Sequence, residues 1–140
     1  MQPLRIAAIA GAIAVLAIST MVSAEEKKEY TAPEAQKEVL LHQLGLAAGD
    51  KLEARVIRFT LPAGFQGGRH YHTGDLIVYV ESGSLTTEME NGTKTYQAGE
   101  VFYETPGEVM RGTNDSTDEE TVLIVFQVGA QGEPLMVEAE

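Results

Sequence analysis

Residues 64–83 constrain the fold of this 140-residue chain more than any other segment. They read GFQGGRHYHTGDLIVYVESG and place His70 and His72 two positions apart, shortly before the continuous apolar run 76–80. In an extended strand, residues two apart point to the same face, so both imidazoles would enter one space. An apolar run of this length is typical of a strand that is covered on both faces. The segment therefore predicts a β-structured interior with two histidines directed into it.

Turn signals separate further short strands along the chain. Residues 37–46 have apolar spacing that suits either a short helix or a strand, and we favour a strand because all that follows is β. Asn91-Gly92 predicts a hairpin with a type I′ turn. Residues 25–36 are polar and charged, and we expect a loose arm. Seven or eight short strands with turns between them predict an all-β sandwich or barrel; they are expected near residues 37–46, 53–61, 76–80, 84–90, 93–97, 101–103 and 121–128.

Residues 1–24 have the pattern of a secretory signal peptide. Arg5 precedes an uncharged run over residues 6–22, and Val22, Ser23 and Ala24 supply the small residues of a cleavage site. We therefore expect an exported protein, periplasmic or extracellular, that has lost residues 1–24. The alternative is an uncleaved membrane anchor, for which the uncharged run is just long enough.

Charge and cysteine content limit the partners. The chain has 21 acidic and 10 basic residues, so removal of Arg5 with the signal leaves 9 minus 21, a formal charge of −12. An acidic surface argues against nucleic acid and anionic lipid as partners, and we expect no membrane association after signal cleavage. The chain has no cysteine, which excludes a disulfide framework and thiolate chemistry.

Two sets of spaced residues carry a family resemblance. Gly64, His70, His72 and Gly83 form the first set, and the second is Gly99, Gly107 and Asn114. From about residue 51 to 128 the chain thereby resembles the cupin superfamily, whose motifs are G(X)5HXH(X)3–4E(X)6G and G(X)5PXG(X)2H(X)3N. The resemblance implies an all-β fold, a single jelly-roll (cupin) β-barrel of short antiparallel strands. The expected organisation is a signal peptide (1–24), an N-terminal arm and first strand (25–50), the barrel (51–130) and a C-terminal tail (131–140).

The same motifs imply an incomplete metal site. Metal-binding cupins use three histidines and one glutamate, of which this chain keeps His70 and His72. Leu76 stands at the glutamate position and Met110 at the third histidine position. One divalent or copper ion on His70, His72 and Met110 is one interpretation, since copper accepts imidazoles together with a thioether. The other is that no metal is bound and Met110 fills the interior as an apolar side chain.

Neighbouring residues do not clearly replace the missing carboxylate. Strand alternation sends Asp75 outward unless Gly74 forms a bulge that shifts the register. Glu104 precedes a turn, and we expect it at the rim of the pocket. The apolar residues Ile77 and Tyr79 also point outward, where they suit a subunit contact, so a homodimer is a reasonable expectation.

Two function classes remain. The first is an exported single-domain cupin that binds a small-molecule ligand, with a weak metal site at His70 and His72 as an additional feature. The second is a metal-dependent copper or iron cupin enzyme such as an oxygenase, in which the metal keeps open positions for substrate or oxygen. The sequence does not decide between them. The expected pocket residues are His70, His72, Leu76, Val78 and Met110.

Overall fold

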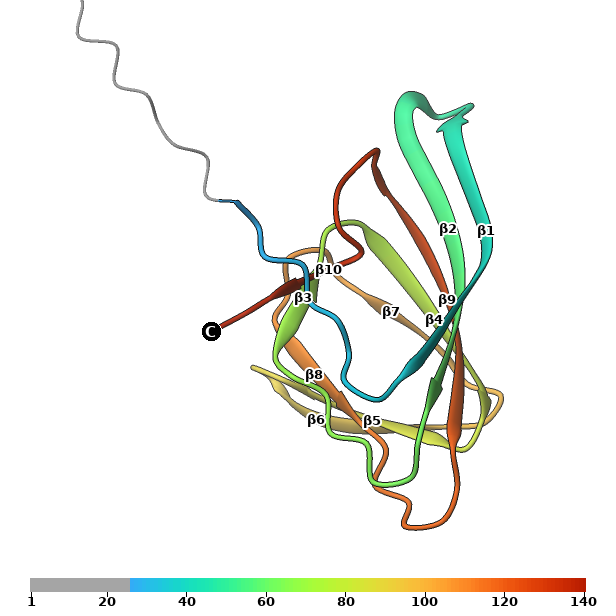
Figure 1. Cartoon of the computed structure of the whole chain (residues 1–140), viewed down its shortest axis with the longest axis vertical. Helices are drawn as coiled ribbons and strands as arrows, with labels where there is room; N and C mark the ends of the chain where they lie inside the picture. Colours follow the sequence, from blue (N-terminus) through green and yellow to red (C-terminus); the bar gives the residue numbers. More distant parts are fainter. Residues whose placement is uncertain (1–25) are drawn as a thin grey trace, which may run out of the picture.

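A computed structural model describes residues 26–140, so the predicted signal peptide lies outside the described residues. Figure 1 shows that the described part is built from strands joined by turns and loops. No helix in this part of the chain has the length and apolar character needed to cross a membrane. The strands are β1 (Gln36–Leu46), β2 (Gly49–Leu61), β3 (His70–His72), β4 (Asp75–Ser82), β5 (Ser84–Met89), β6 (Gly92–Gln97), β7 (Val101–Glu104), β8 (Met110–Thr113), β9 (Thr121–Ala130) and β10 (Met136–Glu138).

The strands form two five-stranded antiparallel sheets that enclose the core (Figure 1). The sheet that we call the β9 sheet has the order β1-β2-β9-β4-β7, and the β8 sheet has the order β10-β3-β8-β5-β6. Strands distant in sequence are neighbours in both, as the jelly-roll topology requires. The predicted all-β jelly-roll fold is confirmed, although the sheets remain separate rather than closing into one hydrogen-bonded barrel.

Strand alternation places the core as the sequence predicts. Alternate residues at the end of β2 and along β4 are buried, whereas Ile77 in β4 is exposed; the buried ones are Ile57, Phe59, Leu61, Leu76, Val78 and Val80. The two inner faces pack against each other and remove their apolar surface from water, which is the main stabilising contribution in such a sandwich. The buried cluster includes Ile57, Phe59, Leu61, Leu76, Val78, Val80, Leu85, Tyr96, Phe102, Leu123 and Val125.

Of three local expectations, one is confirmed, one is partly wrong and one is incomplete. Residues 36–46 are a strand, as we favoured. The 84–97 hairpin forms, but the type I′ turn is wrong: Glu90 and Asn91 lie at the tip, and Asn91 does not have the positive φ that this turn requires. The segment expected as a C-terminal tail contains β10, which pairs with β3 and buries Met136.

The arm that precedes β1 is not loose. Glu29 forms a bridge with Val137, and the Tyr30 backbone N–H donates to the Met136 carbonyl over 3.0 Å. Tyr30 and Ala32 also pack against the core cluster. The arm is polar in sequence but is fixed to the β8 sheet through β10, which the sequence pattern did not reveal.

Asn114 connects three loop segments from a fully buried position. Its Nδ2 donates to the carbonyls of Pro62 over 3.0 Å and Glu119 over 2.8 Å. Its Oδ1 accepts from the Ser116 backbone N–H over 3.1 Å. The side chain therefore satisfies backbone groups that would otherwise be buried without partners.

We predict that Asn114→Asp lowers the free energy of unfolding by at least about 2 kcal/mol, because it places a carboxylate against carbonyl oxygens. Asn91→Asp is the matched control at an exposed hairpin tip and should change stability by less than about 0.5 kcal/mol. Urea unfolding followed by circular dichroism measures both. Equal losses in the two variants would contradict the role of Asn114.

Candidate functional site

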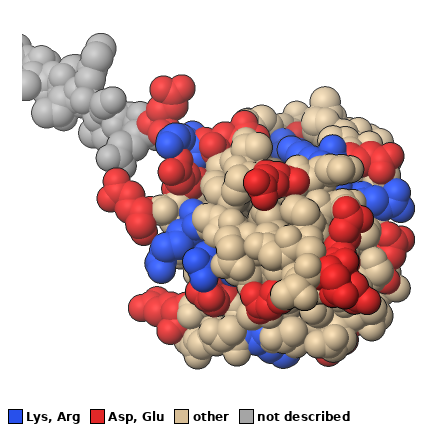
Figure 2. Space-filling view, turned by 60° about the horizontal axis from the view of Figure 1, so that its bottom comes forward, with Lys and Arg blue, Asp and Glu red and all other residues tan. Residues whose placement is uncertain are grey.

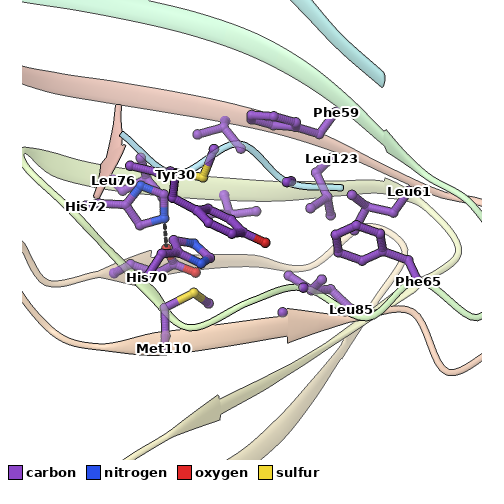
Figure 3. A pocket seen from close by; sticks show the side chains of 17 residues that line it. Tyr30, Phe59, Leu61, Phe65, His70, His72, Leu76, Leu85, Met110 and Leu123 are labelled. Atoms are coloured by element: carbon purple, nitrogen blue, oxygen red, sulfur yellow. Dashed lines mark ion pairs between the residues drawn. The ribbon is translucent and has the colours of Figure 1, made fainter. Parts of the chain in front are cut away.

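A cavity of about 70 Å³ lies between the inner faces of the two sheets. Figure 3 shows His70 and His72 at one end of it and Leu61 and Phe65 at the other. All five predicted pocket residues lie in its wall; their role in binding stays a prediction. The lining residues are Tyr30, Ala32, Phe59, Leu61, Phe65, Gly67, His70, His72, Leu76, Val78, Leu85, Glu104, Met110, Gly112, Leu123, Val125 and Met136.

Backbone carbonyls hold both imidazoles. His70 Nδ1 lies 2.9 Å from the Gly68 carbonyl oxygen, and His72 Nδ1 lies 3.1 Å from that of Leu135. A carbonyl oxygen only accepts, so each Nδ1 carries the hydrogen and each Nε2 is left for other partners. The rings meet edge to face with centroids 5.1 Å apart. The HXH segment thus places two fixed imidazoles at one end of the cavity.

Glu104 is inside the cavity, so the expectation that it lies at the rim is wrong. Its side chain is buried, and its Oε2 lies 3.1 Å from His72 Nε2, the contact drawn as a dashed line in Figure 3. Leu76, which stands at the motif's glutamate position, pairs with Glu104 across β4 and β7. The carboxylate absent from β4 therefore enters the same space from the neighbouring strand.

A signal for Glu104 was present in the sequence. Phe102 is apolar and lies two residues earlier, so a strand continuing to residue 104 would send both side chains to the same face. The structure shows this arrangement, with Phe102 and Glu104 buried and Val101 and Tyr103 exposed. This pattern was missed because a turn follows directly after Glu104.

The contact between His72 and Glu104 leaves one carboxylate oxygen without a hydrogen-bond partner. The Oε2 atom of Glu104 is buried and makes no hydrogen bond of acceptable geometry. If two ligand atoms each lie about 2.0–2.2 Å from one metal ion, they lie about 2.9–3.5 Å from each other. The observed distance of 3.1 Å between His72 Nε2 and Glu104 Oε2 falls in this range. Yet residues 26–140 contain no group of three or more His, Cys, Asp or Glu arranged to hold a metal. The described site therefore fits a metal only in part.

Tyr30 covers the histidine end of the cavity. Its ring stacks on that of His70, with centroids 4.6 Å apart and planes 7° from parallel (Figure 3). Its hydroxyl oxygen accepts from the Gly68 N–H over 2.6 Å. Because Tyr30 belongs to a polar arm, no sequence pattern indicated that it would line the cavity.

Asp75 lies outside the cavity, as strand alternation predicts. It is exposed, and its Oδ1 accepts from the Tyr103 hydroxyl over 2.5 Å. The pairing of β4 with β9 is regular from Asp75 to Val80, and Gly74 precedes β4, so no bulge turns this carboxylate inward. A Cβ at Gly74 would collide with the Val128 carbonyl oxygen, which explains why glycine is needed there.

Burial changes the charge state of His70. Loss of hydration lowers its pKa from 6.5 to about 4; the neighbouring His72 adds to this effect, and the Gly68 carbonyl partly opposes it. His70 is therefore neutral at neutral pH, and its Nε2 offers a lone pair.

The protein-family model for the cupin domain matches residues 57–126 of this chain, which is half of its length. The chain belongs to the cupin family. A search of curated proteins found no match to this cupin. Among solved structures, a cupin domain from Bordetella pertussis Tohama I is 24% identical with a TM-score of 0.55, over 72% of this chain and 99% of that one.

Two further structures are similar to this cupin. A protein with a double-stranded β-helix domain from Klebsiella pneumoniae has a TM-score of 0.58 at 19% identity, over 87% of this chain and 99% of that one. KdgF from Halomonas sp. has a TM-score of 0.54 at 19% identity, over 74% of this chain and 86% of that one. At these identities the likeness shows the fold alone.

We predict a loss of stability in weak acid that depends on His70. Above about pH 6.5 its imidazole is neutral in both the folded and unfolded states. As the pH falls from 6.5 to about 4, the unfolded chain binds a proton that the folded protein does not, so the free energy of unfolding falls by about 3 kcal/mol; below about pH 4 this slope ends.

Urea unfolding between pH 4 and 7, with EDTA present, should show this fall in the wild type and not in His70→Gln. His42→Gln is the control at an exposed histidine and should keep the fall, since His70 is still present. If the wild type and His70→Gln show the same pH dependence, or if NMR titrates the His70 ring near 6.5, the buried neutral state is refuted.

Proposed function

We propose that this protein is an exported cupin that binds a small ligand in the cavity between its sheets. The observation that supports this most is the distribution of polarity: His70, His72 and Glu104 form one polar end, and apolar side chains form the rest of the wall. Ligand pockets commonly combine apolar walls with a few polar groups that fix the orientation of the ligand. Export rests on residues 1–24, which lie outside the described part of the chain.

The polar end selects the chemistry of the occupant. The two Nε2 atoms and Glu104 Oε2 offer lone pairs, whereas both Nδ1 hydrogens are used by backbone carbonyls. An occupant therefore has to donate hydrogen bonds, or be a cation, at this end. A small molecule with an ammonium or hydroxyl group and a short apolar body meets both conditions, and an anionic headgroup does not.

Cavity size limits the ligand. A volume of about 70 Å³ holds only a few non-hydrogen atoms, whereas pockets for drug-sized ligands measure about 300–1,000 Å³. A longer ligand requires Tyr30 to leave its stack on His70. Tyr30 is attached to the β8 sheet by the arm, so it acts in this proposal as the residue that sets the length limit.

We predict that n-butylammonium binds in the cavity and that butyrate, of the same chain length, does not. Glu104→Gln should weaken the binding of butylammonium at least about tenfold, because it removes the carboxylate partner of the cation. Tyr30→Ala should improve the binding of n-hexylammonium relative to butylammonium, and the control Tyr71→Ala, outside the cavity wall, should not. Saturation-transfer NMR and titration calorimetry measure these affinities. Equal binding of butyrate, or no change in Glu104→Gln, would contradict the proposal.

A weak metal site, as in a copper- or iron-dependent cupin such as an oxygenase, is the second candidate. The buried, unpartnered Oε2 of Glu104 beside His72 Nε2 favours it. His72 and Glu104 would be the ligands, with His70 and Met110 close by in the same wall. A metal held there would supply Lewis-acid or oxidative chemistry at open coordination positions. The ligand set is incomplete in the described residues, so the expected affinity is low.

We predict that the protein takes up about one Cu²⁺ or Fe²⁺ per chain in equilibrium dialysis, and that His72→Ala and Glu104→Gln each lose this uptake. His42→Ala is the matched control, because His42 Nε2 forms a similar contact of 2.9 Å with Glu53 Oε2 outside the cavity. Metal analysis by mass spectrometry gives the stoichiometry. No uptake by the wild type, or uptake unaffected by both cavity variants, would exclude this candidate.

A further inference from the structure

A second hollow lies at the surface of the protein, outside the cavity between the two sheets. Its volume is about 630 Å³, within the range of about 300–1,000 Å³ that is usual for pockets that bind drug-sized molecules. Met110 is the one residue that lines both this hollow and the cavity, so it separates the two spaces. We call the hollow the outer cleft. It is large enough for a ligand that the cavity of about 70 Å³ cannot hold.

Two arginines line the outer cleft as neighbours on adjacent strands. His70 of β3 pairs with Met110 of β8 in an antiparallel register. Arg69 directly precedes this pair on one strand and Arg111 directly follows it on the other, so the two arginines lie side by side in the wall. Like charges at opposite positions of neighbouring strands destabilise a sheet. An anion held between the two guanidinium groups would remove this repulsion.

The carboxylates of the chain itself do not satisfy these two arginines. Arg111 Nη2 donates to Glu88 Oε1 over 2.8 Å, but Arg111 Nε is buried and has no hydrogen-bond partner. Arg69 is the one arginine in residues 26–140 that forms no ion pair. The chain has 21 acidic and 10 basic residues, and acidic side chains are spread over the face in Figure 2, so carboxylates are not scarce. Arg69 is therefore available to an anion from solution.

Acidic side chains form another part of the wall of the outer cleft. Glu90 lies at the tip of the hairpin of β5 and β6, and Glu108 lies in the loop between β7 and β8. Neither forms an ion pair with the described residues. Together with Glu88 they place three carboxylates against two guanidinium groups, a net charge of −1. A simple anion would meet repulsion here and a simple cation would leave the arginines unused, whereas a ligand with both charges satisfies both groups.

We propose that the outer cleft binds a basic amino acid, with its carboxylate on the two arginines and its side-chain cation near the two unpaired glutamates. A guanidinium group presents a planar fork of donors that matches a carboxylate with two parallel hydrogen bonds. The net positive charge of such a ligand complements the net charge of the cleft. Its apolar stem contacts Met89 and Val109, which also lie in the wall. This site is independent of the ligand proposed for the cavity.

Titration with L-lysine, followed in the ¹⁵N–¹H NMR spectrum of protein purified after expression of the full chain, tests the proposal. We expect a dissociation constant of about 1 mM at low ionic strength, because each exposed charge pair contributes little. The largest shifts should fall on the residues of the outer cleft, and salt should weaken the binding. L-Norleucine lacks the side-chain ammonium and cadaverine lacks the carboxylate, so each should bind at least about tenfold more weakly than L-lysine.

Variants of the wall provide the second arm of the test. Arg69→Gln should weaken L-lysine at least about tenfold, and because Arg69 is exposed and unpaired the variant should fold normally. Arg58→Gln is the matched control, an arginine outside the outer cleft that pairs with Glu38, and should leave the dissociation constant within about twofold. Glu90→Gln combined with Glu108→Gln should weaken L-lysine and not L-norleucine. No shifts up to about 20 mM L-lysine, equal binding of all three compounds, or equal losses in Arg69→Gln and Arg58→Gln would each overturn the proposal.

Discussion

The burial of two imidazoles and a carboxylate inside an otherwise apolar core is the constraint on which the rest of this structure depends. Unpaired polar groups in such a place cost about 1–3 kcal/mol each, and more when they are charged. The fold reduces this cost with backbone groups: the carbonyls of Gly68 and Leu135 each accept from one imidazole. The loop before β3 and the residue immediately before β10 are therefore part of the site, although neither supplies a side chain that reacts.

The remaining free-energy cost of burying polar groups falls at the end of the cavity where an occupant would bind. Glu104 Oε2 keeps no hydrogen-bond partner, and His70 is held neutral by its surroundings. Replacing such buried polar groups with apolar side chains of similar volume is often neutral or stabilising, so their presence here favours a functional role. The proposed small ligand and the proposed metal ion are two ways to satisfy the same lone pairs, and both would lie at the end of the cavity that Tyr30 covers.

Local periodicity was sufficient to predict much of the fold and five of the residues that line the cavity. Alternation along a single strand predicted one shared face for His70, His72, Leu76 and Val78, and the second motif added Met110. The single strand is wrong, because the two histidines lie on β3 of the β8 sheet and the two apolar residues on β4 of the β9 sheet, but all five side chains line the same cavity. Glu104 was missed because its direction depends on where β7 ends, which the following turn obscured.

Tyr30 and β10 were missed for a different reason. Their positions depend on contacts between the two ends of the chain, such as the bridge between Glu29 and Val137. A polar arm carries no periodic signal, so a contact over more than one hundred residues cannot be read from local sequence. Of the apolar residues on the outer face of the β9 sheet, only Ile77 and Tyr79 were predicted, because others such as Phe126 come from strands whose register the sequence does not define.

The ¹⁵N NMR spectrum of the histidine rings tests the central claim most directly. In a comparison of the wild type with Glu104→Gln, the account predicts a large change at His72 Nε2, a smaller change at His70, and none at His42. It also predicts that Nδ1 carries the hydrogen in both buried rings. If Glu104→Gln leaves all three histidines unchanged, or if the buried rings carry the hydrogen on Nε2, then these side chains do not share the interior described here.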